Sequence, residues 1–167
     1  MKKIAREEVV QNALIENYEK YYRLAYGLVR SEADALDIVQ ESAYKAIMKS
    51  ESLRTEEFVD TWICRIVINE ANAFFRKKRD LSDVSEMNLS TEDTYTDIDL
   101  ARAIDSLEPK EREIVILRYF EDKKIEEIAV IMNEKVGTVK SRLYRCMEKL
   151  RVRLEGQRSE NIRQNNK

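Results

Sequence analysis

The sequence predicts an all-α protein with two small helical domains, joined by an acidic linker, and with a helix-turn-helix in the C-terminal domain. Only three glycines and one proline occur in 167 residues, which favours helices with few tight turns. Apolar residues recur at steps of three and four in both halves of the chain, as on the buried face of an amphipathic helix. Between the two halves lies a stretch that is rich in acidic and poor in apolar side chains.

The uneven distribution of charge places the expected domain boundaries. The net charge is only -2, but residues 81–108 are strongly acidic, whereas residues 109–167 are basic. The acidic stretch is interpreted either as a solvated tether or as a strand that occupies a basic channel. We expect an N-terminal domain at 1–80, the linker at 81–97, a C-terminal domain at 98–155 and a polar, frayed tail at 156–167.

Composition also excludes several classes of function. The chain has no histidine, and therefore no Ser-His-Asp or Cys-His pair and no imidazole metal ligand. It has too few glycines for a phosphate-binding loop, and Cys64 and Cys146 lack the spacing of a zinc or redox motif. We expect no enzyme, no metal and no cofactor, and both cysteines reduced and buried. Without a membrane span or a signal peptide, the expected location is the cytoplasm, with no insertion into a membrane.

The first half of the chain predicts three helices. The first is a single long helix with an aromatic-rich buried face, and the second begins at a capping box formed by Ser31 and Asp34. The face of the second helix that is opposite its apolar residues is polar and could meet water or a partner. The buried positions of the first helix are Val10, Leu14, Tyr18, Tyr21, Ala25 and Leu28, and the polar positions of the second are Asp37, Gln40, Glu41 and Tyr44.

The third helix carries an apolar stripe and a second, hydrogen-bonding stripe. The apolar stripe extends from Phe58 to Phe74, and the polar stripe leads into a run of four cations at 76–79. Cations suit a helix C-terminus, but four in a row, next to amides and aromatic rings, favour binding of a nucleic-acid backbone with unstacked bases. The polar stripe consists of Thr61, Arg65, Asn69, Asn72 and Arg76.

The second half predicts a short helix, a helix that begins after Pro109 and ends at Phe120, and then a helix-turn-helix. The turn is Asn133–Lys135, because asparagine tolerates the left-handed backbone that a turn needs. The last helix is expected to bury Val136, Val139, Leu143, Met147, Leu150 and Leu154. Its outer face is rich in donors for base edges and phosphates, as in a recognition helix of the major groove. These donors are Thr138, Lys140, Ser141, Arg142, Tyr144, Arg145 and Lys149.

Three motifs in order resemble bacterial sigma factors of the extracytoplasmic-function kind, and the resemblance covers nearly the whole chain. They are the segments 34–41 (DALDIVQE), 61–69 (TWICRIVIN) and 136–143 (VGTVKSRL). The resemblance implies that the first domain engages core RNA polymerase and melts the minus-10 promoter element, while the second reads the minus-35 element. It also implies a linker that threads through the polymerase, and an anti-sigma factor, free or membrane-anchored, as a further partner.

The resemblance assigns roles to individual residues. Asp37, Gln40 and Glu41 would bind the polymerase clamp. The loop 50–60 would hold a flipped minus-10 base, and the separated strand would lie along Trp62, Arg65, Asn69, Arg76 and Lys77. The minus-35 duplex would be contacted by Arg118, Lys140, Ser141, Arg142, Tyr144 and Arg145. The chain departs from the family pattern at Thr55, Ala73, Asn133, Glu134 and Lys135, and these departures bear on base preference and on the angle of the recognition helix.

Three other functions compete with this interpretation. A conventional helix-turn-helix regulator would act as a homodimer on a symmetric operator. An enzyme on DNA would need a nucleophile and an acid or metal cluster, which the first half does not display. A helical adaptor would not need the basic exposed helix. Because phosphate neutralisation supplies most sequence-independent affinity for DNA, a sigma factor with a net charge of -2 should bind DNA weakly until polymerase separates its two domains.

Overall fold

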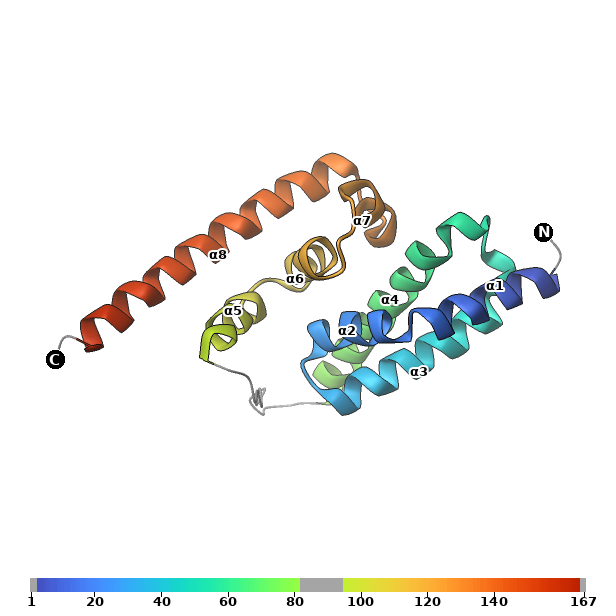
Figure 1. Cartoon of the computed structure of the whole chain (residues 1–167), viewed down its shortest axis with the longest axis horizontal. Helices are drawn as coiled ribbons and strands as arrows, with labels where there is room; N and C mark the ends of the chain where they lie inside the picture. Colours follow the sequence, from blue (N-terminus) through green and yellow to red (C-terminus); the bar gives the residue numbers. More distant parts are fainter. Residues whose placement is uncertain (1–2, 82–94, 166–167) are drawn as a thin grey trace. The chain divides into compact units, whose positions relative to one another are not determined.

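A computed structural model describes residues 3–81 and 95–165, and all regular structure in these residues is helical (Figure 1). This confirms the predicted fold class. The described chain forms two compact units, the first with α1 to α4 and the second with α5, α6, the start of α7 and α8. Most of the expected linker, residues 82–94, lies outside the described residues. No helix among the residues that the structure describes is both long enough and apolar enough to cross a membrane.

The first unit is a bundle of four helices with two single turns of 3-10 helix between α3 and α4. Its core lies between α2, α3 and α4. Helix α2 buries Tyr21 and Leu24, α3 buries Ile38, and α4 buries Ile63 and Val67. The elements are α1 (Lys3–Glu16), α2 (Tyr18–Val29), α3 (Glu32–Met48), η1 (Ser50–Ser52), η2 (Glu56–Phe58) and α4 (Val59–Leu81).

Asn17 separates α1 from α2, so the expectation of one long helix is wrong. The side-chain amide of Asn17 donates to the carbonyl of Ala13 at 3.1 Å, and such side-chain bonding to the backbone competes with a regular helix. The backbone of Asn17 leaves the helical region, with φ −116° and ψ 22°. After the break Tyr18 is exposed rather than buried. At the next boundary the prediction is confirmed, because the hydroxyl of Ser31 accepts a hydrogen bond from the N–H of Asp34 at 3.4 Å and caps α3.

The second unit packs α5 and α6 against α8. Its core holds Ala103, Ile104, Leu107, Val115, Cys146 and Leu150. The elements are α5 (Tyr95–Asp105), α6 (Pro109–Val115), the π-helical segment η3 (Ile116–Phe120), α7 (Ile125–Met132) and α8 (Val136–Asn165). The predicted helix after Pro109 is therefore interrupted by π-helical geometry, in which the N–H of Glu121 donates to the carbonyl of Ile116 at 3.1 Å.

The turn between α7 and α8 has the geometry expected from its asparagine. Asn133 has a φ of 54°, and the backbone N–H of Glu134 donates to the carbonyl of Ala129 at 2.9 Å. The N–H of Asn133 donates to the carbonyl of Val130 at 3.2 Å. These bonds form a Schellman motif, which ends one helix so that the next can leave in a new direction.

The course of α8 corrects two expectations. Met147 and Val136 are 39% and 36% exposed, and Cys146 is fully buried in the position expected for Met147. The Cys146 thiol lies against the backbone carbonyl of Glu111 at 3.9 Å. Both cysteines are free and buried, as predicted. The helix also continues to Asn165, so that residues 156–165 are helical rather than frayed.

Candidate functional site

One exposed face of α3 combines acidic, amide and apolar side chains. Asp37, Gln40 and Glu41 are all exposed, as the sequence predicted. They are flanked on the same helix by Leu36, Tyr44 and Met48, which are 40%, 61% and 65% exposed. This group, called the α3 face below, offers both charge and apolar area, a combination suited to another protein surface.

Lys45 joins the α3 face to α4. Its ammonium Nζ lies 2.7 Å from Oε2 of Glu70 on α4 and 3.2 Å from Oε1 of Glu41, one turn away on α3. The hydrogen bond to Glu70 raises the pKa of Lys45, against the opposing effect of burial, and Glu41 adds to the rise. One cation thus holds two carboxylates on different helices.

The polar stripe of α4 is confirmed at four of its five predicted positions, since Arg65, Asn69 and Arg76 are exposed and Asn72 is half-buried. Thr61 is buried instead, and Phe58, expected in the apolar stripe, is 54% exposed. The half-buried Trp62 lies on the same side as Arg65, Asn69 and Arg76, and these four residues are called the α4 face below, with Lys77 exposed beside them. These residues follow at steps of three, four and seven, which places an aromatic ring, guanidinium groups and an amide along one side of the helix.

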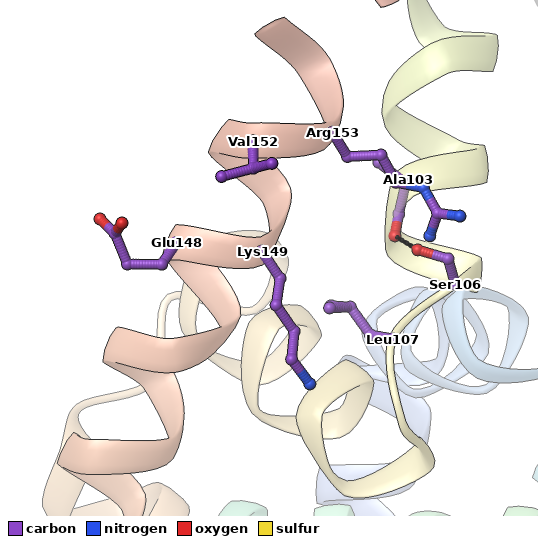
Figure 2. Close-up of a pocket in the computed structure, with 7 residues that line it drawn as sticks. All are labelled: Ala103, Ser106, Leu107, Glu148, Lys149, Val152 and Arg153. Carbon is purple, nitrogen blue, oxygen red and sulfur yellow. Dashed lines mark hydrogen bonds between the residues drawn. The ribbon is translucent and has the colours of Figure 1, made fainter. Parts of the chain in front are cut away.

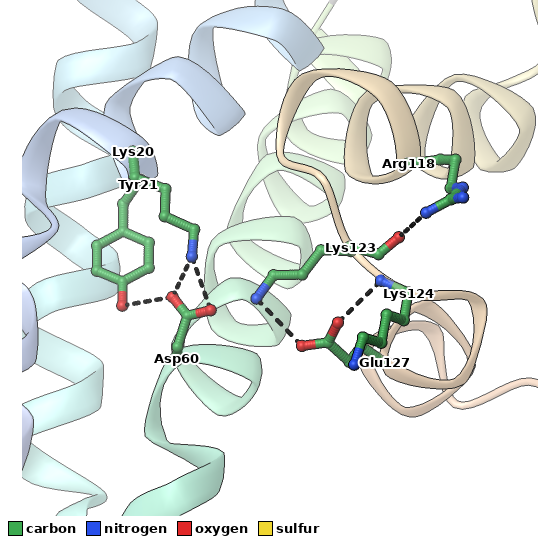
Figure 3. A network of polar contacts seen from close by, with 7 residues as sticks. All are labelled: Lys20, Tyr21, Asp60, Arg118, Lys123, Lys124 and Glu127. Carbon is green, nitrogen blue, oxygen red and sulfur yellow. Dashed lines mark hydrogen bonds and ion pairs between the residues drawn. The ribbon is translucent and has the colours of Figure 1, made fainter.

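The loop between α3 and α4 is anchored at both ends. At its start the Arg6 guanidinium donates to the carbonyl of Glu51 at 2.8 Å, and Leu53 is 1% exposed. At its end Asp60 accepts hydrogen bonds from Nζ of Lys20, at 2.7 Å to each carboxylate oxygen, and from the hydroxyl of Tyr21 at 3.1 Å (Figure 3).

Burial and the negative charge of Asp60 keep the hydroxyl of Tyr21 protonated, because both raise its pKa. The hydroxyl therefore remains a donor to Asp60. Between these two anchored ends, residues 54–58 are exposed to solvent. No local pattern in the sequence predicts this arrangement, because Lys20 and Asp60 are 40 positions apart.

In the second unit, four of the predicted DNA-contacting residues project from the first turns of α8. Lys140, Ser141, Tyr144 and Arg145 are exposed, and Tyr144 is 70% exposed. Arg118 does not belong to this group. It is half-buried, and its Nη1 donates to the carbonyl of Lys123 at 3.0 Å (Figure 3), so it braces the turn before α7.

Arg142 also differs from the exposed donors of α8. Its side chain is 21% exposed, and its Nη1 lies 3.4 Å from Oε1 of Glu134 in the turn before α8. The predicted set of six therefore comprises four exposed side chains and two arginines that are bonded within the protein. Among the exposed four, the hydroxyl of Ser141 donates to the carbonyl of Thr138 at 3.2 Å.

A groove of about 500 Å³ separates the end of α5 from α8 (Figure 2). Its walls include the buried Leu107 and the 62% exposed Val152, with Lys149 and Arg153 beside them. The hydroxyl of Ser106 is turned inward to the carbonyl of Ala103 at 2.6 Å. The groove thus presents apolar area edged by both cations and the carboxylate of Glu148.

Lys149 also ties α8 to α6. Its Nζ lies 2.7 Å and 2.9 Å from the carboxylate oxygens of Glu111. Burial by itself raises the pKa of Glu111, but the hydrogen bonds from Lys149 and from the backbone N–H of Glu108 outweigh it, so the pKa lies below its ordinary value.

This shift predicts an acid-labile contribution to stability. A carboxyl group whose pKa is lower in the folded than in the unfolded state stabilises the fold above its ordinary value of 4.5, and the stabilisation is lost as the pH falls below it. We expect Glu111→Gln to melt at a lower temperature than the original chain above that pH, and the difference to shrink in acid. Thermal unfolding followed by circular dichroism over a pH series measures it.

Glu155→Gln is the matched control, because Glu155 is exposed and pairs with Arg151 on the same helix at 3.5 Å. The melting temperature of the Glu155→Gln protein should change with pH in the same way as that of the original chain. A Glu111→Gln protein with an unchanged pH profile would show that the bond to Lys149 contributes nothing to folding.

Each of the two units matches a known protein family. Residues 14–80 match the family Sigma-70 region 2, and residues 97–150 match Sigma-70, region 4. RNA polymerase sigma factor SigV of Bacillus subtilis (strain 168) is 38% identical over 158 residues, which cover 92% of this chain and 95% of that protein. The ECF RNA polymerase sigma factor SigW of the same organism is 28% identical over 156 residues, covering 81% and 83%.

Solved structures show the same fold. Sigma factor RpoE from Bartonella quintana, in complex with the anti-sigma factor NepR, superposes with a TM-score of 0.73 and 24% identity over 87% of this chain and 96% of that one. CnrH, in complex with the cytosolic domain of CnrY, gives a TM-score of 0.69 and 18% identity over 92% and 97%. This chain therefore belongs to the sigma-70 family of RNA polymerase sigma factors and is of the extracytoplasmic-function (ECF) type.

Proposed function

We propose that the chain directs core RNA polymerase to promoters, and that three exposed faces bind the polymerase, the minus-10 element and the minus-35 element. The α3 face docks on the polymerase through Asp37, Gln40 and Glu41. The α4 face and the loop 50–60 open the minus-10 element, and the start of α8 reads the minus-35 duplex. The observation that carries the proposal is that the core of the first unit supports an acidic face on α3 and an arginine- and amide-bearing face on α4, both open to partners.

At the minus-10 element the α4 face would bind the strand that leaves the duplex. Trp62 offers a ring on which a base can stack, and Arg65 and Asn69 supply donors along the same line. Arg76 and Lys77 would neutralise phosphates. A base removed from the stack needs a preformed pocket, and the anchors at Asp60 and Leu53 would hold the loop 50–60 in place for it.

At the minus-35 element Lys140, Ser141, Tyr144 and Arg145 would meet the duplex. One well-placed bidentate contact to a base discriminates by about 1–3 kcal/mol, so the exposed Arg145 is the strongest candidate for selectivity. Arg118 and Arg142 would act on the geometry of the reading helix, since both are bonded within the protein.

The remaining parts follow from this division. The working boundaries are a polymerase-binding and minus-10 domain at 1–80, an acidic linker at 81–97 that passes through the polymerase, and a minus-35 domain at 98–155. The protein would act in the cytoplasm by binding, without catalysis of its own. The structural relative RpoE was solved in complex with the anti-sigma factor NepR, and CnrH in complex with the cytosolic domain of CnrY. We therefore include an anti-sigma factor among the partners of this chain.

Run-off transcription with reconstituted core polymerase on genomic fragments tests the function directly. We expect defined start sites that appear only when the protein is added. Because its net charge is -2, the free protein should bind the same fragments weakly at physiological salt. Tight, specific binding without polymerase, together with a stable homodimer in light scattering, would instead establish the helix-turn-helix regulator.

A further inference from the structure

Glu134 lies in the turn before α8 and contacts two helices. Its Oε1 accepts a hydrogen bond from Nζ of Lys110 on α6 at 3.0 Å and lies 3.4 Å from Nη1 of Arg142 on α8. The side chains of Glu134 and Arg142 are each 21% exposed, whereas that of Lys110 is 63% exposed. The hydrogen bond and charge of Lys110 lower the pKa of Glu134, and Arg142 adds to the effect. The carboxylate is therefore ionised at neutral pH and bridges α6 and α8.

A second ion pair joins the same two helices further along. Lys149 of α8 bonds Glu111 of α6 at 2.7 Å. On α6 the anchoring residues, Lys110 and Glu111, are consecutive, while on α8 Arg142 and Lys149 are two turns apart on one side, roughly 10 Å along the axis. Two attachments separated along a helix restrain its tilt as well as its position.

The tilt of α8 decides what its outward donors can reach. A hydrogen bond from a side chain to a base edge tolerates only a few tenths of an ångström beyond about 3.2 Å. A site whose supporting residues are loosened by about 1 Å loses its geometry although its contact residues remain. Loss of the Glu134 attachment would thus disturb all the donors of α8 together.

We propose that Glu134 and Arg142 are positioning residues that set the angle at which α8 meets the minus-35 duplex, with Arg142 bound to Glu134 instead of to a base. The inference rests on the proposed reading of that element by α8. It is specific to this chain's turn, since the carboxylate of Glu134 is what brings Lys110 and Arg142 together.

The test is promoter selection by reconstituted holoenzyme from a library randomised over the minus-35 element. We expect Glu134→Gln and Arg142→Ala each to reduce discrimination about tenfold, comparable to the loss of one good base contact, and to do so at every position of the element. The double variant should lose no more than either single one, because the two residues act as a unit. Arg142→Lys, which can still pair with Glu134, should retain the original preference.

Glu155→Gln is the control for removal of a carboxylate from the surface of α8, and melting temperatures show that each variant is folded. If Arg142→Ala and Arg142→Lys both abolish preference at a single base pair while Glu134→Gln does not, Arg142 reads a base and the inference is wrong. A Glu134→Gln holoenzyme with unchanged selectivity also overturns it. If the original holoenzyme shows no minus-35 preference, the proposed function of α8 fails first, and the inference fails with it.

Discussion

Reversing two charges on α3, with Asp37→Lys and Glu41→Lys together, is expected to weaken binding to core RNA polymerase by at least about 100-fold. Like charges that are brought together at an interface cost several kcal/mol, and every 1.4 kcal/mol is a factor of ten in affinity. Both carboxylates are exposed on the α3 face, so their replacement does not disturb the buried core. Titration of labelled protein with core polymerase, followed by fluorescence anisotropy, measures the loss.

The double variant Glu8→Lys and Glu16→Lys is the matched control. Both of these residues are exposed on α1, and the change in net charge is the same. Melting temperatures must also be compared, because Lys at position 41 would stand one turn from Lys45 and repel it by a few tenths of a kcal/mol. If the α3 variant is folded and still assembles normally with the polymerase, the α3 face is not the docking surface.

The second large effect is expected on promoter opening. Arg65→Ala combined with Asn69→Ala should reduce the amount of open complex by roughly 10- to 100-fold, because each lost charged or amide contact to the separated strand is worth about 1 kcal/mol or more. Binding to core polymerase and to a minus-35 duplex should be unchanged, since the contacts proposed for them are on α3 and α8. Permanganate reactivity of unpaired thymines near the minus-10 element measures opening.

Asn12→Ala with Lys49→Ala serves as the comparison, since both residues are exposed in the same unit but lie outside the α4 face. A template that already carries an unpaired minus-10 bubble separates two causes. If the α4 variant opens no bubble on duplex DNA but binds the preformed bubble normally, these side chains drive melting without holding the melted strand. Normal opening by the α4 variant would remove Arg65 and Asn69 from the minus-10 site.

The sequence predicted the helices best where periodicity and a cap agree. Ser31 at the start of α3 and Asn133 after α7 mark ends through their own side-chain or backbone chemistry. Periodicity alone failed at Asn17, because the apolar spacing continues through a local break. It also failed to distinguish Cys146 from Met147, since both positions satisfy a step of three or four. Only the crossing of α8 over α6 decides between them.

The candidate site was predictable in its outward residues and not in its supporting ones. Asp37, Arg65 and Arg145 are charged at positions opposite an apolar stripe, so their exposure follows from helix geometry. The partner of Asp60 is Lys20, 40 positions away on another helix, and a single sequence carries no signal for such a contact. Arg142 bonds to Glu134, only eight positions away, but the bond depends on the direction in which the turn sends α8, and helical spacing does not predict that direction.

Lys45 makes the charges of α3 and α4 depend on each other, because one ammonium group pairs with Glu41 on α3 and with Glu70 on α4. A partner that drew the carboxylate of Glu41 away would leave Lys45 paired with Glu70 alone. If the α3 face docks on the polymerase as proposed, the charge balance on α4 would therefore change with docking.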